Sequence, residues 1–159
     1  MIFIEYLLLL LTLFSSTFVG LLLAYIAPEE LRSGKKYIFY FQTVIIILIP
    51  SLIFYFIGVD VYTISLFLLL LGLLYFKKED QTVSFYLMGL VAFASLSNNV
   101  LINIESTLVF ILGMLVSLLY TGQYEEKEKM IKPFFHLFGE ILLKYSLFVV
   151  LGLLPYWIL

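Results

Sequence analysis

Three side chains that can carry or exchange a proton lie at helical spacing in the last apolar segment of the chain. His136, Glu140 and Lys144 are spaced i, i+4 and i+8, which stacks them along one face of a helix. Counted from Phe134, Glu140 lies about 9 Å and Lys144 about 15 Å along that helix, at about 1.5 Å per residue. If the helix crosses a hydrocarbon core of about 30 Å, Lys144 lies near its middle.

Two roles suit this charged face. The functional role is a proton or ion relay, or a counter-charge for a substrate, because an ionised group in hydrocarbon is costly and must face protein or water. The structural role is a pair in which Glu140 and Lys144 neutralise each other and hold the last helix against a neighbour or a partner subunit. The sequence leaves both roles open. His136 on its own is more typical of a residue at the membrane surface.

The composition indicates that lipid is the solvent for most of the chain. Hydrophobic residues make up 64% of the 159 residues and charged residues 13%, which is far from the balance of a soluble domain. We therefore predict an all-α, polytopic integral membrane protein. It forms a single transmembrane domain over residues 1–159, a bundle of six transmembrane helices in three hairpins. The predicted spans are residues 2–26, 38–57, 61–76, 82–97, 106–121 and 134–158.

Lys and Arg residues are distributed unevenly among the hydrophilic segments. Eight of the nine fall in residues 27–37, 77–81 and 123–133, whereas the segments around Asp60 and from Ser97 to Glu105 carry only acidic charge. Basic residues in short loops are retained in the cytoplasm. We therefore expect a multi-pass protein of the plasma membrane, with the three basic loops inside and both termini outside.

Helix-bending and small residues form a second group of candidate positions. Pro50 lies in the middle of the second span, where it removes a backbone hydrogen bond and predicts a helix kink. That kink is either purely structural or lines a path together with nearby polar residues. Gly113 and Ser117 form a small-x-x-x-small pair, and Gly89 belongs to another small surface. Such surfaces allow close packing of helices within a bundle or between protomers.

Several classes of site cannot be assembled from these residues. The chain has one histidine and no cysteine, which excludes a thiolate or zincin-like site, so we expect no metal and no cofactor. No phosphate-binding glycine loop, nucleotide fingerprint or Gly-x-Ser-x-Gly turn occurs, and we therefore expect no enzyme. The net charge of −2 gives no reason to expect nucleic acid as a partner.

Two functions fit a membrane protein with short loops and no catalytic set. The first is a small transporter or channel-like protein that moves an ion or small solute past the charged face of the last helix. The second is a non-catalytic membrane subunit or scaffold of a larger membrane complex, and a membrane enzyme acting on lipid ranks third. The expected partners are membrane lipid and either further copies of the chain or a larger complex, because six short helices enclose little volume.

Overall fold

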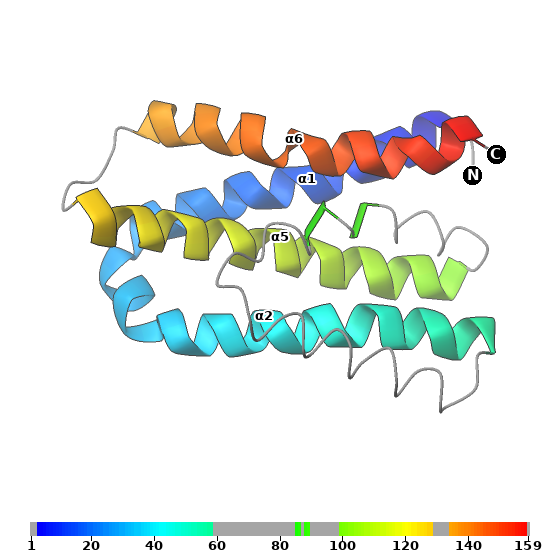
Figure 1. Cartoon of the computed structure of the whole chain (residues 1–159), viewed down its shortest axis with the longest axis horizontal. Helices are drawn as coiled ribbons and strands as arrows, with labels where there is room; N and C mark the ends of the chain where they lie inside the picture. The colour runs from blue at the N-terminus through cyan, green and yellow to red at the C-terminus, as the bar shows by residue number, and fades with distance from the viewer. Residues whose placement is uncertain (1–2, 59–84, 87, 90–98, 129–133, 159) are drawn as a thin grey trace.

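The computed structural model describes residues 3–58, 85–86, 88–89, 99–128 and 134–158, and the regular structure in these residues is entirely helical (Figure 1). Most of them belong to four long helices: α1 (Phe3–Ile26), α2 (Pro28–Ile57), α5 (Asn99–Glu128) and α6 (Phe134–Ile158). Each of the four contains a stretch of 21 to 24 residues that is long and apolar enough to cross a membrane. The four helices therefore indicate a membrane-embedded protein.

The first and last helices coincide with the predicted spans 2–26 and 134–158. Helix α1 ends at Ile26 and a single non-helical residue, Ala27, separates it from α2. Pro28 then occupies the first turn of α2, where its missing N–H costs no helical hydrogen bond. The turn between the first two helices is therefore one residue long.

The second span differs from the prediction at its start. The predicted cytoplasmic loop 27–37 is helical from Pro28 onward, and α2 runs without interruption to Ile57. Hydropathy locates the edge of the membrane, but a helix satisfies its own backbone in water as well as in lipid. Most of the residues in this loop, such as Glu, Leu, Arg and Lys, are also good helix formers. The helix ends at Gly58, which has φ 80° and donates its N–H to the last turn.

The fifth span is longer than the predicted residues 106–121. Helix α5 begins at Asn99 and ends at Glu128, so the predicted loop Ser97–Glu105 is helical from Asn99 onward. The predicted loop 123–133 is likewise helical as far as Glu128. Polar residues in this segment suggest a loop, but the apolar residues between them continue the helical pattern. This difference places Glu105 inside the apolar stretch Val100–Gly122.

The third and fourth predicted spans, 61–76 and 82–97, lie outside the described residues for most of their length, as does the predicted loop 77–81. Within the fourth span the structure describes Phe85, Tyr86, Met88 and Gly89, all of them helical. The prediction of six helices in three hairpins is therefore not confirmed.

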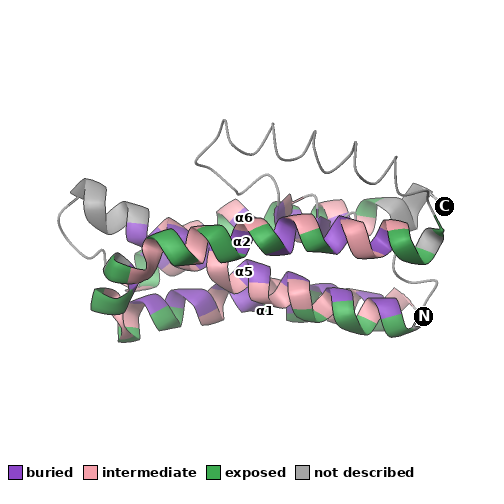
Figure 2. Ribbon diagram, turned by 90° about the horizontal axis from the view of Figure 1, so that it is seen from below, coloured by how far each residue is buried: buried purple, intermediate pink, exposed green. Residues whose placement is uncertain are grey.

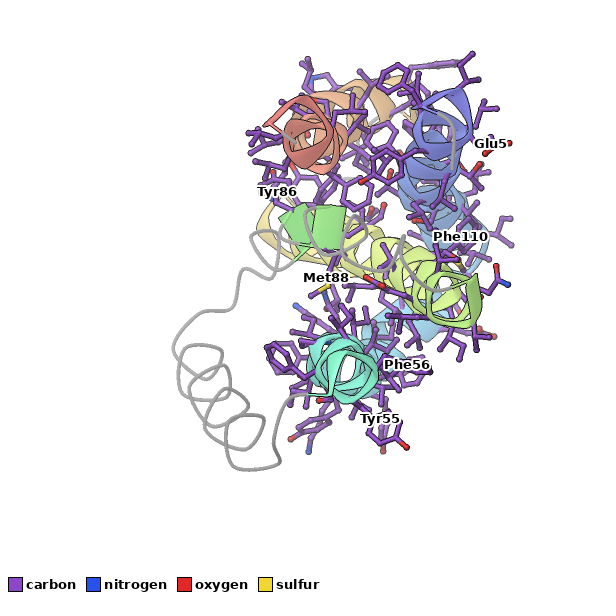
Figure 3. The ribbon with its side chains drawn as sticks, turned by 90° about the vertical axis from the view of Figure 1, so that its right-hand side faces the viewer. Glu5, Tyr55, Phe56, Tyr86, Met88 and Phe110 are labelled. Carbon is purple, nitrogen blue, oxygen red and sulfur yellow. The ribbon has the colours of Figure 1, made fainter. Side chains whose placement is uncertain are left out.

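Helix α5 lies at the centre of the described helices. It packs against α1 and against α2, and α6 packs against α1. The end-on view shows α1 and α6 on one side of α5 and α2 on the other (Figure 3). The consecutive helices α1 and α2 touch little, so they do not form the packed hairpin that the sequence predicts. Figure 1 places both ends of the chain at one end of the bundle, opposite the α1–α2 corner.

The bundle has an apolar core and an apolar exterior. Buried side chains from all four helices form one cluster, which includes Leu10 and Leu13 of α1, Ile49 of α2, Leu112 of α5 and Ile141 of α6. Many large hydrophobic side chains are also exposed, and Figure 2 shows in green where exposed residues of every kind lie along the helices. Contiguous exposed apolar surface of this kind is unfavourable in water and suits contact with lipid.

Candidate functional site

The charged face of α6 begins with a contact between His136 and Glu140. The Nδ1 atom of His136 lies 3.3 Å from a carboxylate oxygen of Glu140, and their side chains are 57% and 27% exposed. The i, i+4 spacing within one helix produces this contact directly. This part of the face lies in the first two turns of α6, at the end of the bundle where α1 meets α2 (Figure 1).

Lys144 lies one turn further along α6 and faces α5. Its ammonium nitrogen is 4.1 Å from the centre of the Tyr120 ring and 5.7 Å from the centre of the Tyr145 ring. Both distances are within the range of a cation–π attraction, which is strengthened where the cation is shielded from water. A structural pair of Glu140 with Lys144, one of the two roles that the sequence leaves open, stays a prediction; the contacts described here join Glu140 to His136 and Lys144 to tyrosine rings. Tyr120 was not identified from the sequence, because its contact with α6 depends on tertiary packing.

A group of aromatic side chains surrounds Lys144. The Tyr86 hydroxyl donates a hydrogen bond of 2.5 Å to the backbone carbonyl of Lys144. The Tyr145 ring packs edge-on against Phe85, with ring centres 5.7 Å apart. These contacts fix the middle of α6 against Phe85 and Tyr86 (Figure 3).

An apolar layer follows these tyrosines along α6. Phe148 is fully buried and stacks on Phe85, with ring centres 4.5 Å apart and ring planes 13° apart. One turn beyond Phe148, the carbonyl of Gly152 accepts a hydrogen bond of 2.8 Å from the buried Tyr6 hydroxyl. Polar groups therefore occupy α6 on both sides of the Phe85–Phe148 stack.

Glu105 is a candidate that the sequence interpretation missed. Its side chain is 2% exposed in α5, and its carboxyl group lies near enough to the Tyr6 hydroxyl of α1 to interact with it electrostatically. Leu101 and Val109, one turn on either side, are also buried. The sequence contains a sign of this burial, because Leu101, Glu105 and Val109 share one helix face. That sign was missed because Glu105 was assigned to a loop.

Pro50 is buried in α2, which remains helical through it to Ile57. The Ser51 hydroxyl bonds the carbonyl of Ile47 at 2.6 Å. Gln42, two turns earlier, is fully buried, and in the described part of the chain neither atom of its amide group has a hydrogen-bond partner. Buried amides are normally hydrogen-bonded, so Gln42 is an unusual position. The kink at Pro50 stays a prediction.

The small residues singled out in the sequence lie at helix contacts. A side chain at Gly113 would collide with the Ser16 hydroxyl of α1, and one at Gly89 would collide with the Phe148 carbonyl of α6. Ser117 is buried. These glycines allow α1 and α5, and the Gly89 segment and α6, to approach closely.

The described residues contain no group of three His, Asp, Glu or Cys side chains that could hold a metal ion. No protein-family model, curated protein or solved structure matches the chain. The functional argument therefore depends on the geometry of Glu105, Glu140, Lys144 and the tyrosines around them.

Proposed function

We propose that the protein moves an ion or a small solute across the membrane along the contacts of α6 with α1 and α5. Glu140 and Lys144 act at the end of this path where α1 meets α2. A chain of 159 residues forms a bundle that encloses little volume, so we propose that the working unit is a homo-oligomer. We further propose that it lies in the plasma membrane and has no enzymatic activity.

The position of Lys144 carries this proposal. Lys144 belongs to the apolar stretch Phe134–Leu154, and its ammonium group lies over the ring of Tyr120 in the neighbouring helix. Ionisable side chains within membrane helices are rare, and those that face the interior of a bundle mark ion and substrate pathways. Glu140, one turn away, is only 27% exposed and supplies the opposite charge.

Flux measurements on proteoliposomes test the proposal. The purified protein is reconstituted, and uptake of H⁺, Na⁺, K⁺ and small anions is compared with that of empty vesicles. We expect flux above the empty-vesicle level from the wild type and none from Glu140→Gln. The matched control is Glu5→Gln, which removes an exposed acid of α1 and should leave the flux unchanged. Wild-type protein that gives no flux above empty vesicles for any of these solutes would refute transport.

A second candidate function is that of a non-catalytic membrane subunit. The observation that favours it is the pair of tyrosine rings beside the Lys144 ammonium, because aromatic faces stabilise a fixed cation without any transported ion. A subunit of this kind shows no flux when purified alone, and Lys144→Met then weakens its recovery with a larger complex extracted in mild detergent. A transporter retains its flux in the absence of other proteins.

A further inference from the structure

Glu105 is an acid buried in the apolar part of a membrane helix, at the end of the bundle opposite to Glu140. Its side chain is 2% exposed, and it lies in the stretch Val100–Gly122 of α5, which is apolar enough to cross the membrane. Transferring an ionised carboxylate to such a site costs several kcal/mol or more. Binding a proton removes that cost, because the neutral acid is far easier to bury.

The hydrogen bond of Tyr6 determines which form of Glu105 its hydroxyl can stabilise. The Tyr6 hydroxyl donates its hydrogen to the carbonyl of Gly152 at 2.8 Å, and a carbonyl oxygen can only accept. The Tyr6 hydroxyl therefore has no hydrogen left to donate to Glu105. A carboxylate is acceptor-only, whereas a protonated carboxyl group can donate. Since the two groups lie within electrostatic reach of each other, Tyr6 favours the protonated acid.

Among the described residues, Glu5 precedes Tyr6 on α1 and its side chain is exposed, whereas the titratable groups of α6 from His136 to Tyr145 lie further along the bundle. Lys144 and Tyr145 precede Phe148 on α6, whereas Gly152, the partner of Tyr6, follows it. Tyr86 bonds to the carbonyl of Lys144 and so belongs to the same level. On α2 the buried side chains are apolar except for Gln42, which does not titrate. Within the described residues, Tyr6 is thus a titratable neighbour that interacts with Glu105.

We propose that Glu105 is a proton-binding site and that the ion moved through this bundle is a proton. The second half of this inference rests on the proposed transport function, whereas the first half does not. On release, the O–H bond of the carboxyl group breaks, its electron pair stays on the carboxylate, and the proton passes to water at the end of the bundle that holds both termini. The Phe85–Phe148 stack separates this site from Lys144 and must rearrange or admit water for a proton to cross.

Infrared spectroscopy of the purified full-length protein tests the proton on Glu105. A protonated carboxyl group has a C=O stretch that is distinct from carboxylate bands and moves to lower frequency in D₂O. We expect this band at neutral pH in the wild type, its loss in Glu105→Gln, and its retention in the control Glu140→Gln. If Glu105→Gln does not fold, Glu105→Asp should shift the band instead. Identical spectra for the wild type and the Glu105 variants would overturn the inference.

A cation titration and the flux assay complete the test. Replacing choline chloride by NaCl at constant pH should leave the band unchanged. Its disappearance would show that Glu105 holds a metal cation and would overturn a proton site.

In proteoliposomes, Glu105→Gln should abolish proton flux. If Glu140→Gln abolishes flux while Glu105 carries no proton band, transport stands and this inference fails. If the band is present but the wild type gives no flux, Glu105 binds a proton and the transport function fails.

Discussion

The Tyr6 hydroxyl in the first helix and the Gly152 carbonyl in the last are joined by a buried hydrogen bond of 2.8 Å across 146 residues of sequence. The bond lies at the end of the bundle where the chain begins and ends (Figure 1). Next to it, Leu10 of α1 packs closely against Gly152. α1 and α6 are therefore held together by a specific polar contact in addition to apolar packing.

Replacing Tyr6 by Phe should reduce the free energy of unfolding by about 1 kcal/mol, because one intramolecular hydrogen bond is lost while the ring still fills its site. Unfolding by SDS titration in mixed micelles measures this change. The matched control is Tyr55→Phe, which alters an exposed tyrosine of α2 and should change nothing. Equal stability of Tyr6→Phe and the wild type would show that the bond contributes no net stability.

Two glycines offer a matched pair for testing the contact between α1 and α5. A Cβ atom at Gly20 would collide with the backbone carbonyl oxygen of Met114, whereas no atom of the described residues lies within 4 Å of a Cβ at Gly139. Gly20→Ala should therefore destabilise the protein by about 1–3 kcal/mol, since the clash with a backbone forces the helices apart. Gly139→Ala should be neutral or stabilise by up to about 1 kcal/mol. Thermal unfolding in detergent compares the two, and an equal effect at both positions would contradict the close approach.

The sequence predicted membrane spans well where a change in hydropathy coincides with a helix end. Pro28 and Ala27 interrupt the helix at the place where apolar residues stop, so the end of α1 was predictable. At Asn99 and at Glu128 the helix continues beyond the apolar stretch. Hydropathy reports transfer into lipid, and it does not report whether the backbone stays helical in water. Helix ends in polar segments are therefore the part that pattern alone could not supply.

The candidate site could be predicted only within single helices. The spacing of His136 and Glu140 anticipates their contact, because i, i+4 neighbours are fixed by helix geometry. The cost of burying a cation indicates that Lys144 needs a compensating group. The identity of that group, Tyr120, depends on how α5 and α6 are arranged in space. The burial of Glu105 depends equally on α1, which is remote in sequence.

Lys144 and Tyr120 should show a measurable interaction energy. In a double-mutant cycle of Lys144→Met and Tyr120→Leu, we expect a coupling of about 0.5–2 kcal/mol in the free energy of unfolding, because each single change removes the same cation–π contact. Tyr120→Phe preserves the aromatic face and so keeps the contact with Lys144, and its cycle with Lys144→Met should therefore show a coupling near zero. Additive effects of Lys144→Met and Tyr120→Leu would show that the contact contributes nothing.

The sign of the stability change on replacing Gln42 shows whether its buried amide is a cost to the fold or binds another group. Its buried amide has no hydrogen-bond partner in the described part of the chain, and such a group costs about 1–3 kcal/mol. Gln42→Met keeps the length of the side chain and removes the amide, so the protein should become more stable by about that amount. Ser51→Ala is the control, because the Ser51 hydroxyl already bonds the Ile47 carbonyl and its loss should not stabilise. A loss of stability in Gln42→Met would show that the amide binds a group essential to the fold.

The unequal distribution of Lys and Arg predicts how the helices are oriented in the membrane. Ser33 lies at the start and Gly58 at the end of the apolar stretch of α2, and basic loops are retained inside. The chain has no cysteine, so single cysteines at Ser33, at Asn99, at Gln123 and inserted after Gly58 give labelling without background. Insertion is preferred at Gly58, because its φ of 80° strains any substituted residue.

A membrane-impermeant maleimide should label intact cells only at Gly58 and Asn99, and permeabilised cells at all four positions. Labelling of Ser33 or Gln123 in intact cells would reverse the orientation and place both termini in the cytoplasm.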